Sequence, residues 1–466
     1  MSENNIYIDS ESLLNLFESR QYTALMNELD QFSPIDAAEF LSSLPFEKLP
    51  LMFRMLKKDM AADIFAELDS ELQEKLIEKM TDREISDILE ELYTDDAVDM
   101  LEEMPASVVY RIMKNVTPQT RAEINRFLSY PDGSAGSVMT SEFLDLKKEM
   151  TCKEAVDRIR RIGLDKETVY VAYVLGKART LEGVVPLKSL LFADPDEKIE
   201  DIMNPNVLFA YTHDDRETVA NMISRYDILA LPITDKERRL VGIVTVDDAL
   251  DVLEDEATED IEKMAAILPT DKPYMKTGVW ETWKKRVPWL LLLMLTATFT
   301  STIITHYEAA IGTYAILTAF VPMLMNTGGN AGSQSSVTIV RGLSLGEIEM
   351  RDVFRVLLKE ISVSILCGIT LAAATFLKVM AIDFRFQAST ALENGIMQNN
   401  LQIAAVISIT VFFGIVIAKI VGTLLPIATK RIGLDPAVMA SPFITTIVDT
   451  VTLIIYFTVA TLLLHI

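Results

Sequence analysis

Five long apolar stretches follow Trp280 in this chain of 466 residues, and they limit the possible fold more than any other feature. Each has about the 20 residues that a helix needs to cross about 30 Å of hydrocarbon. We expect membrane-spanning helices near residues 287–306, 314–338, 354–381, 402–428 and 437–465. The second stretch is the least continuous because residues 326–336 are small and polar. The sequence therefore predicts a multi-pass membrane protein.

Charge is divided unequally between the two halves of the chain. Residues 1–275 hold 30 Lys and Arg against 57 Asp and Glu, whereas residues 276–466 hold 13 against 10. An acidic half argues against a nucleic-acid partner, because phosphate groups are bound by Lys and Arg. It favours bound cations instead. Two cysteines and three scattered histidines are too few for a disulfide framework or a zinc site.

The positions of basic residues around the spans predict the orientation of the protein, since Lys and Arg gather on the cytoplasmic side. The opposite side has only Lys378 and Arg385. We expect a cytoplasmic N-terminal half and, because five spans separate the two ends, an outer C-terminus in the cell membrane. The predicted cytoplasmic side holds Lys284, Lys285, Arg286, Arg341, Arg351, Arg355, Lys359, Lys430 and Arg431.

Two segments of the membrane half are unusual for inert spans. Residues 322–335 contain three glycines within five residues, which disfavour a helix, together with Asn, Ser and Gln side chains that suit a hydrated ion. Close packing of helices through small residues is the alternative, and the two roles can coexist. Asp449 lies about a dozen residues into the fifth stretch. Since an ionised carboxylate there costs at least ~2.5 kcal/mol, we expect it to face water, a cation or a partner rather than to be a protonated structural residue.

An internal repeat with a period of 12 residues runs from residue 32 to about residue 128. Apolar residues recur at one position of each unit and again four residues later, which marks one face of a helix. Turn and cap residues follow, so each unit is predicted to be a short helix that stacks on its neighbours in a superhelix. The first apolar set is Phe40, Met52, Ile64, Leu76, Ile88, Met100, Ile112 and Ile124, and the second is Leu44, Leu56, Leu68, Met80, Leu92, Met104, Val116 and Leu128.

Residues 136–258 contain a different repeat of about 60 residues, with a helix, two strands and a helix in each copy. Residues 138–140 parallel 202–204, 151–156 parallel 215–220, 169–174 parallel 229–233, and 181–185 parallel 240–244. This pattern resembles a tandem pair of CBS (cystathionine-β-synthase-type) domains. Such pairs bind adenine nucleotides or ions and regulate an attached domain.

Acidic residues gather on helix faces in the soluble half. Asp95, Asp96 and Asp99 share one face, as do Asp247, Asp248 and Asp251, because residues three and four apart are neighbours on a helix. A solvated surface is the alternative for any single cluster. Together the clusters favour Mg²⁺, which is held by a few carboxylates and retained waters.

The order of these parts, with the segments NTGGNAGSQS and GLDPA…SPFITTIVD in the membrane half, resembles the MgtE family of magnesium channels. The resemblance implies a multi-domain protein without enzymatic activity: an all-α superhelix (1–135), an α/β tandem CBS pair (136–252), an acidic connecting or plug helix (253–276) and a five-helix transmembrane pore domain (277–466). It also implies a homodimer in membrane lipid, with Mg²⁺ as substrate and regulator.

The resemblance assigns roles to particular residues. Asp449, Asp435 and Asn330 are implied to bind Mg²⁺ in or near the pore. Tyr170 is implied to stack on an adenine, with ATP as a possible cofactor, although a core tyrosine is the alternative. Asp63 replaces an expected glutamate, so its reach is shorter. The implied regulatory Mg²⁺ ligands are Asp63, Asp95, Asp99, Glu217, Asp227, Asp248, Asp251, Glu256, Glu259 and Asp260.

Other functions remain as alternatives. A proton- or sodium-coupled transporter of divalent cations would use Asp449 but would need a second titrating group in the membrane, for which we consider Glu308 and Asp383, both near span ends. A membrane enzyme is disfavoured because no catalytic dyad, HExxH or GxSxG lies in the spans. A scaffold without transport is disfavoured by the isolated Asp449.

Overall fold

The computed structural model describes residues 10–270, 274–275, 277–307, 316–383, 400–439 and 441–464. The chain separates into two units that join at residues 253 and 254. Each unit has a hydrophobic core of its own. We describe the two units separately.

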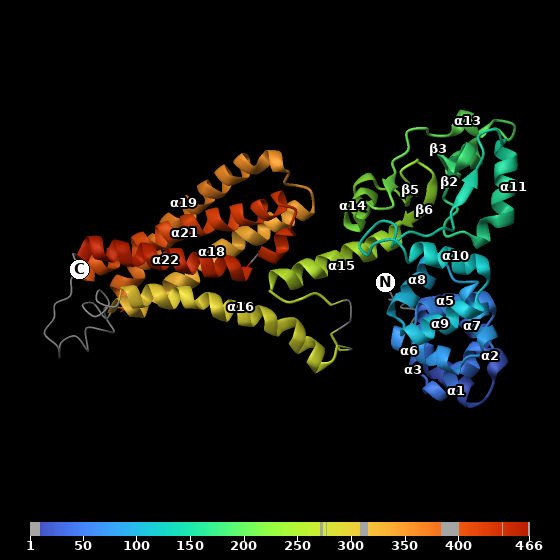
Figure 1. Cartoon of the computed structure of the whole chain (residues 1–466), viewed down its shortest axis with the longest axis horizontal. Coiled ribbons are helices and arrows are strands. Elements are labelled where there is room, and N and C mark those ends of the chain that lie inside the picture. The colour runs from blue at the N-terminus through green and yellow to red at the C-terminus, as the bar shows by residue number, and fades with distance from the viewer. Residues whose placement is uncertain are drawn as a thin grey trace, which may run out of the picture. The chain divides into compact units, whose positions relative to one another are not determined.

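The first unit begins with a stack of short helices, drawn in blue to cyan in Figure 1. Nine of the ten are between eight and ten residues long, which fits a repeat of 12 residues. The helices are α1 (Ser10–Glu18), α2 (Tyr22–Leu29), α3 (Pro34–Ser43), α4 (Leu49–Phe53), α5 (Lys58–Ala66), α6 (Ser70–Lys79), α7 (Asp82–Leu89), α8 (Thr94–Glu103), α9 (Ala106–Asn115) and α10 (Pro118–Phe127).

The packing of this stack confirms the repeat. All eight residues of the first apolar set are buried, and the second set is buried or packed against the same core. Helices begin where the turn residues predict: Thr81 caps α7 and forms a reciprocal capping box with Glu84, and Thr117 caps α10. The repeat thus buries one continuous core that no single short helix could bury alone.

The same unit continues with two copies of a small α/β fold, which confirms the tandem pair. In each copy a short first strand pairs in parallel with the second, and the second pairs antiparallel with the third. Both copies have an irregular register at the same place, after Val174 and after Ile233. The first copy has β1 (Leu144–Leu146), α11 (Cys152–Ile162), β2 (Val171–Leu175), β3 (Leu181–Pro186), α12 (Leu187–Phe192) and α13 (Ile199–Ile202); the second has β4 (Ala210–Tyr211), α14 (Arg216–Tyr226), β5 (Ala230–Thr234), β6 (Leu240–Thr245) and α15 (Val246–Met264).

The second unit is a bundle of long helices that run beside one another (Figure 1). Four of the helices are long and apolar enough to cross a membrane. The predicted count of five spans is not confirmed, because the glycine- and asparagine-rich α18 is not among these four. The helices are α16 (Val279–His306), α18 (Ile316–Ser344), α19 (Val353–Lys378), α21 (Asn400–Arg431) and α22 (Ser441–Leu464).

Candidate functional site

Asp449 lies in the middle of α22 and borders a cavity of 360 Å³ in the membrane half. Its Oδ1 atom is shielded from solvent and has no hydrogen-bond partner among the described residues. A buried carboxylate oxygen without a donor is costly, so this position favours a bound cation or water. The cavity is lined by Ala297, Thr300, Ser301, Ile304, Thr305, Met325, Thr446 and Asp449, from α16, α18 and α22.

Glycines allow α18 to pass close to Asp449. A Cβ atom built on Gly329 would lie 3.0 Å from Thr445 Cγ2 and 3.8 Å from Asp449 Oδ1. One turn further along, a Cβ atom on Gly422 of α21 would lie only 2.2 Å from the carbonyl oxygen of Gly332. Larger residues at these two crossings would push the helices apart, so the close packing considered for this segment is present.

The helix α18 is continuous, although its four glycines disfavour helix formation and Pro322 lies inside it. Asn330 is exposed in the single chain, and its amide donates to Asn326 Oδ1 at 3.2 Å. Tertiary packing therefore outweighs helix propensity here. The two asparagines place a polar strip on this helix next to the glycines that face α22.

Asp435 lies just before α22 and binds the end of α15. Its Oδ2 accepts from Lys263 Nζ at 2.7 Å, and Lys263 also pairs with Glu259 at 2.6 Å. Burial opposes the ammonium charge, but hydrogen bonds to Asp435 and Glu259 raise the pKa of Lys263. Asp260 accepts from Ser344 at the end of α18, at 3.0 Å. Of the predicted plug residues, Asp260 thus contacts the end of α18, Glu259 pairs with Lys263 on α15 itself, and Glu256 lies one turn earlier on α15.

An acidic face lies where the helical stack meets the CBS pair, and we define it as Asp95, Asp96, Glu142, Glu167 and Asp248. Glu142 caps the first turn of α8: its carboxylate accepts from the Thr94 hydroxyl at 2.8 Å and from the Thr94 N–H at 3.4 Å. Asp248 caps α15 by accepting from the Thr245 hydroxyl at 2.5 Å. Within the part of the chain that the structure describes, Asp95 Oδ1 and Glu167 Oε2 are shielded from solvent and have no hydrogen-bond partner.

Burial, reinforced by neighbouring carboxylates, raises the pKa of several groups on this face. The pKa of Asp95 rises well above its usual value, that of Asp96 rises to about 6 and that of Glu167 to about 8. Burial also raises the pKa of Asp248. The folded protein therefore resists ionisation at this face, and a cation that neutralises it would stabilise the fold.

The other predicted sensor residues lie around or beyond this face. Burial raises the pKa of Asp63, on α5, which also contributes its charge to the environment of Asp96. Burial and the neighbouring charge of Asp251 raise the pKa of Glu67. Asp99 lies one turn after Asp95 on α8. Outside the face, Glu217 is in the first turn of α14 and Asp227 is the left-handed residue that ends it. Within the described part of the chain, no three His, Cys, Asp or Glu side chains form a ready-made metal site.

These pKa values predict how the stability of the soluble half (residues 1–275) depends on pH. A carboxyl group whose pKa is raised in the folded state contributes stability at pH values below its pKa in the unfolded chain. This contribution is lost as the pH rises through its pKa in the folded protein. For Asp96 and Glu167, this loss covers the interval from about pH 4 to about pH 8. Without divalent cations, we expect Glu167→Gln to raise the unfolding temperature near pH 8, by about 2–4 °C for each kcal/mol gained.

Thermal unfolding is measured from about pH 4 to about pH 8 for this variant and for the wild type. The difference between their unfolding temperatures isolates the contribution of Glu167 from that of the other titrating groups. It should shrink toward zero near pH 4 and in millimolar Mg²⁺. A lower unfolding temperature for the variant near pH 8 would contradict a strained carboxylate at this position.

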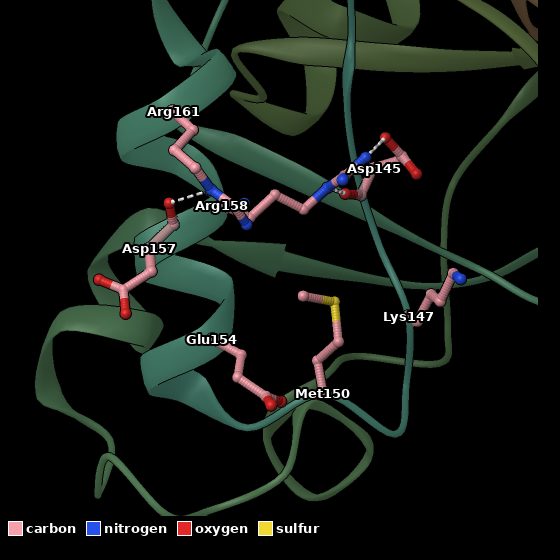
Figure 2. A pocket seen from close by; sticks show the side chains of 7 residues that line it. All are labelled: Asp145, Lys147, Met150, Glu154, Asp157, Arg158 and Arg161. Carbon is pink, nitrogen blue, oxygen red and sulfur yellow. Dashed lines mark hydrogen bonds and ion pairs between the residues drawn. The ribbon is translucent and has the colours of Figure 1, made fainter.

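Tyr170 precedes β2 and is 63% exposed, so the alternative of a core tyrosine is wrong; Tyr173 fills that place. A separate pocket of 540 Å³ lies beside α11 (Figure 2). Both of its arginines have partners in the pocket: Arg158 Nη2 donates to Asp145 Oδ1 at 2.6 Å, and Arg161 Nε donates to the carbonyl oxygen of Asp157 at 3.2 Å. The pocket is lined by Asp145, Lys147, Met150, Glu154, Asp157, Arg158 and Arg161.

Sequence reasoning missed four charged residues, of which two lie at the acidic face and two lie inside the membrane half. Glu142 and Glu167 complete the acidic face, and no helical spacing links them to Asp95 or Asp248. Glu360 and Lys419 lie inside predicted spans, and their charge in an apolar stretch was a signal that could have found them. Of the two titrating groups considered there, Asp383 pairs with Lys378 at 3.2 Å, and Glu308 lies outside the described residues.

Three family models match successive parts of the chain: the MgtE intracellular N domain over residues 32–133, a CBS domain over residues 199–255, and the MgtE divalent cation transporter model over residues 321–459. The magnesium transporter MgtE of Thermus thermophilus is 36% identical over 97% of this chain and 98% of its own length. The magnesium transporter MgtE of Bacillus subtilis is 30% identical over 94% and 93%. A crystal structure of the soluble part of a magnesium transporter matches with a TM-score of 0.52 and 32% identity, over 53% of this chain and 98% of that one.

Proposed function

This chain belongs to the MgtE family of magnesium transporters, and from this premise we propose that it is a Mg²⁺ channel that its own acidic cytoplasmic region closes when cytoplasmic Mg²⁺ is high. The family is one of membrane proteins that transport divalent cations, not of enzymes. The observation that carries the channel proposal is Asp449, a carboxylate in a membrane helix with one shielded oxygen that lacks a donor.

The surroundings of Asp449 suit a hydrated ion. Mg²⁺ gives up its waters reluctantly and is bound through one or two carboxylates. Six waters occupy about 180 Å³ at about 30 Å³ each. The cavity of 360 Å³ leaves room for such a shell, and the hydroxyls of Thr300, Ser301, Thr305 and Thr446 around it can accept from or donate to the waters. Asp449 would then attract the ion without stripping it.

We propose a homodimer in which both copies of Asp449 face a shared path. The exposed amides of Asn326 and Asn330 support this arrangement, because polar side chains at membrane depth need water or a second chain around them. In the same proposal, Asn330 lines the path and Asp435 stands at its cytoplasmic end. The N-terminal half then lies in the cytoplasm and the C-terminus outside.

Closure would follow from charge at the acidic face. Residues 1–275 hold far more acidic than basic side chains, and raised pKa values at Asp96 and Glu167 report the cost of gathering them. Mg²⁺ ions that retain water would neutralise Asp95, Asp96 and Asp248, so that the closed state binds the ion more tightly than the open one. The predicted ligands Asp63, Asp99, Asp251, Glu217 and Asp227 would add to this binding.

The helix α15 would carry the signal. Its first turn holds Asp248 of the acidic face, and its last turn holds Lys263, whose ammonium binds Asp435. Fifteen residues of helix span about 22 Å, so an event at one end is passed on as a rigid displacement. We propose that Glu256, Glu259 and Asp260 hold this plug end, within residues 253–276, against the ends of the membrane helices when Mg²⁺ is bound.

We also propose that the CBS pair binds an adenine nucleotide such as ATP, with the exposed ring of Tyr170 available for stacking. Binding of a fluorescent adenine nucleotide to wild type but not to Tyr170→Ala would support this role, and equal binding to both would remove it.

Single-channel recording tests the main proposal. The purified protein is placed in a planar bilayer with Mg²⁺ as the permeant cation, and Mg²⁺ on the side of the soluble half is stepped from near zero to millimolar. Openings that disappear as this Mg²⁺ rises are expected. A silent bilayer, together with Mg²⁺ uptake into vesicles that requires a proton or sodium gradient, would instead favour the coupled transporter.

A further inference from the structure

Three polar side chains from three helices meet inside the membrane half, and we call them the polar triad: Ser335 on α18, Glu360 on α19 and Lys419 on α21. The hydroxyl of Ser335 donates to Glu360 Oε2 at 2.7 Å and accepts from Lys419 Nζ at 3.1 Å. The ammonium and the carboxylate are 3.7 Å apart. Ser335 therefore bridges two opposite charges.

Both charged side chains are shielded. The side chain of Lys419 is 8% exposed and that of Glu360 is 13% exposed. A single charge is costly at membrane depth, and removal of one partner from a buried pair leaves the other charge uncompensated. Buried pairs add little stability compared with apolar residues of similar size, so their value lies more in fixing one arrangement of the helices.

The triad lies beside a close helix crossing at Gly332 and Gly422. Gly332 and Ser335 are three residues apart on α18, and Lys419 and Gly422 are three apart on α21, so each pair shares a face. The close approach at Gly332 and Gly422 brings the two helices together one turn from the Lys419–Ser335 hydrogen bond. Small residues permit this approach, but apolar contact alone fixes rotation poorly, whereas a directed hydrogen bond fixes it well.

The same face of α18 leads to Asp449. Gly329, Gly332 and Ser335 follow one another at intervals of three, and six residues of helix span about 9 Å. A Cβ atom built on Gly329 would lie 3.8 Å from Asp449 Oδ1, and Asn330 is the next residue of α18. A rotation or slide of α18 at the triad would therefore move Gly329 and Asn330 relative to the carboxylate.

We propose that Ser335, Glu360 and Lys419 are positioning residues that hold α18 in the rotation at which Gly329 and Asn330 face the ion path beside Asp449. The inference rests on the proposed ion path, because it assigns these residues to the geometry of that path. They touch no ion themselves and act through α18.

Cysteine labelling in the full-length protein tests the position of α18 directly. Cys152 and Cys367 are free cysteines, so both are first replaced by serine, and Asn330→Cys is added as a reporter for a water-soluble maleimide. We expect Ser335→Ala and Lys419→Met each to change the labelling rate of folded protein, and to lower Mg²⁺ uptake without the reporter by at least about tenfold, or about 1.4 kcal/mol. Lys419→Arg should retain most of both.

Controls separate positioning from loss of stability. Lys359→Met removes an exposed charge next to Glu360, and Ser362→Ala removes a hydroxyl that bonds only within α19 through Leu358 among the contacts described; both should behave as wild type. If Lys419→Met does not fold, the double variant Glu360→Gln with Lys419→Met leaves no unpaired charge and takes its place. Labelling and uptake that match wild type in Ser335→Ala and in the double variant would overturn the proposal. Uptake that survives Asp449→Asn would refute the ion path instead, while labelling would still report the position of α18.

Discussion

Asp449→Asn is expected to give a folded membrane protein whose Mg²⁺ flux is at least about 100-fold below that of wild type. Asparagine has nearly the same shape as aspartate but carries no charge. Two unit charges 4 Å apart interact by about 4 kcal/mol at an effective dielectric constant of 20, and a divalent ion interacts more strongly. Since each 1.4 kcal/mol corresponds to a factor of ten, loss of this attraction alone accounts for the expected reduction.

Mg²⁺ entry into proteoliposomes with an internal magnesium dye measures this effect at equal protein content, and size-exclusion chromatography reports the fold. Asp383→Asn is a matched control, because this aspartate is paired with Lys378 near the end of a span and away from the cavity residues. Asp449→Glu restores the charge with a longer reach and should recover part of the flux. Wild-type entry through Asp449→Asn would refute the assignment of Asp449 to the ion path.

The parts of the fold that repeat were predictable from the sequence. The eight residues from Phe40 to Ile124 recur every 12 positions because each short helix buries the same side, and all eight are buried in the structure. The two α/β copies were predictable because each strand pair is local. The added first strands, β1 and β4, were not predicted, since strands of three and two residues carry too little pattern.

The candidate site was predictable where a single residue conflicts with its surroundings. Asp449 stands out because a carboxylate in an apolar stretch is costly wherever the helices pack. The charged residues that come together in the folded protein were not predictable as partners. Glu142 and Glu167 join Asp95 and Asp248 only through the contact of the helical stack with the CBS pair, and the Lys419–Glu360 pair depends on which faces of α19 and α21 meet.

The continuity of α18 shows how tertiary structure can override local preference. Glycines that disfavour an isolated helix allow close approach in a bundle, where packing against Thr445 and Val448 of α22 compensates. The same composition lowers the hydropathy of α18, which is why this span, the second of the five predicted, does not meet the criterion that the other four meet. An ion path and an ordinary apolar span make opposite demands on the sequence.

Asp248→Ala combined with Asp251→Ala is expected to keep the channel open at cytoplasmic Mg²⁺ concentrations that close the wild type. Asp248 lies among Asp95, Asp96 and Glu167 at the acidic face, and we propose that closure needs a cation there to offset the repulsion. Without the two carboxylates, the closed state loses part of its preference for Mg²⁺, and a loss of about 1.4 kcal/mol raises the half-inhibiting concentration about tenfold.

The measurement is the open probability of single channels as Mg²⁺ on the side of the soluble half rises, and the current through an open channel should stay as in wild type. Glu39→Ala with Glu47→Ala is the matched control, because it removes the same net charge from exposed positions of the helical stack. If net charge alone set closure, both double variants would shift inhibition equally. If the acidic face sets closure, only Asp248→Ala with Asp251→Ala will shift inhibition. Charges a few angstroms apart in a shielded site interact more strongly than distant charges, which are screened over about 8–10 Å of salt solution. Unchanged inhibition in Asp248→Ala with Asp251→Ala would remove these residues from the sensor and leave the Asp449 path unaffected.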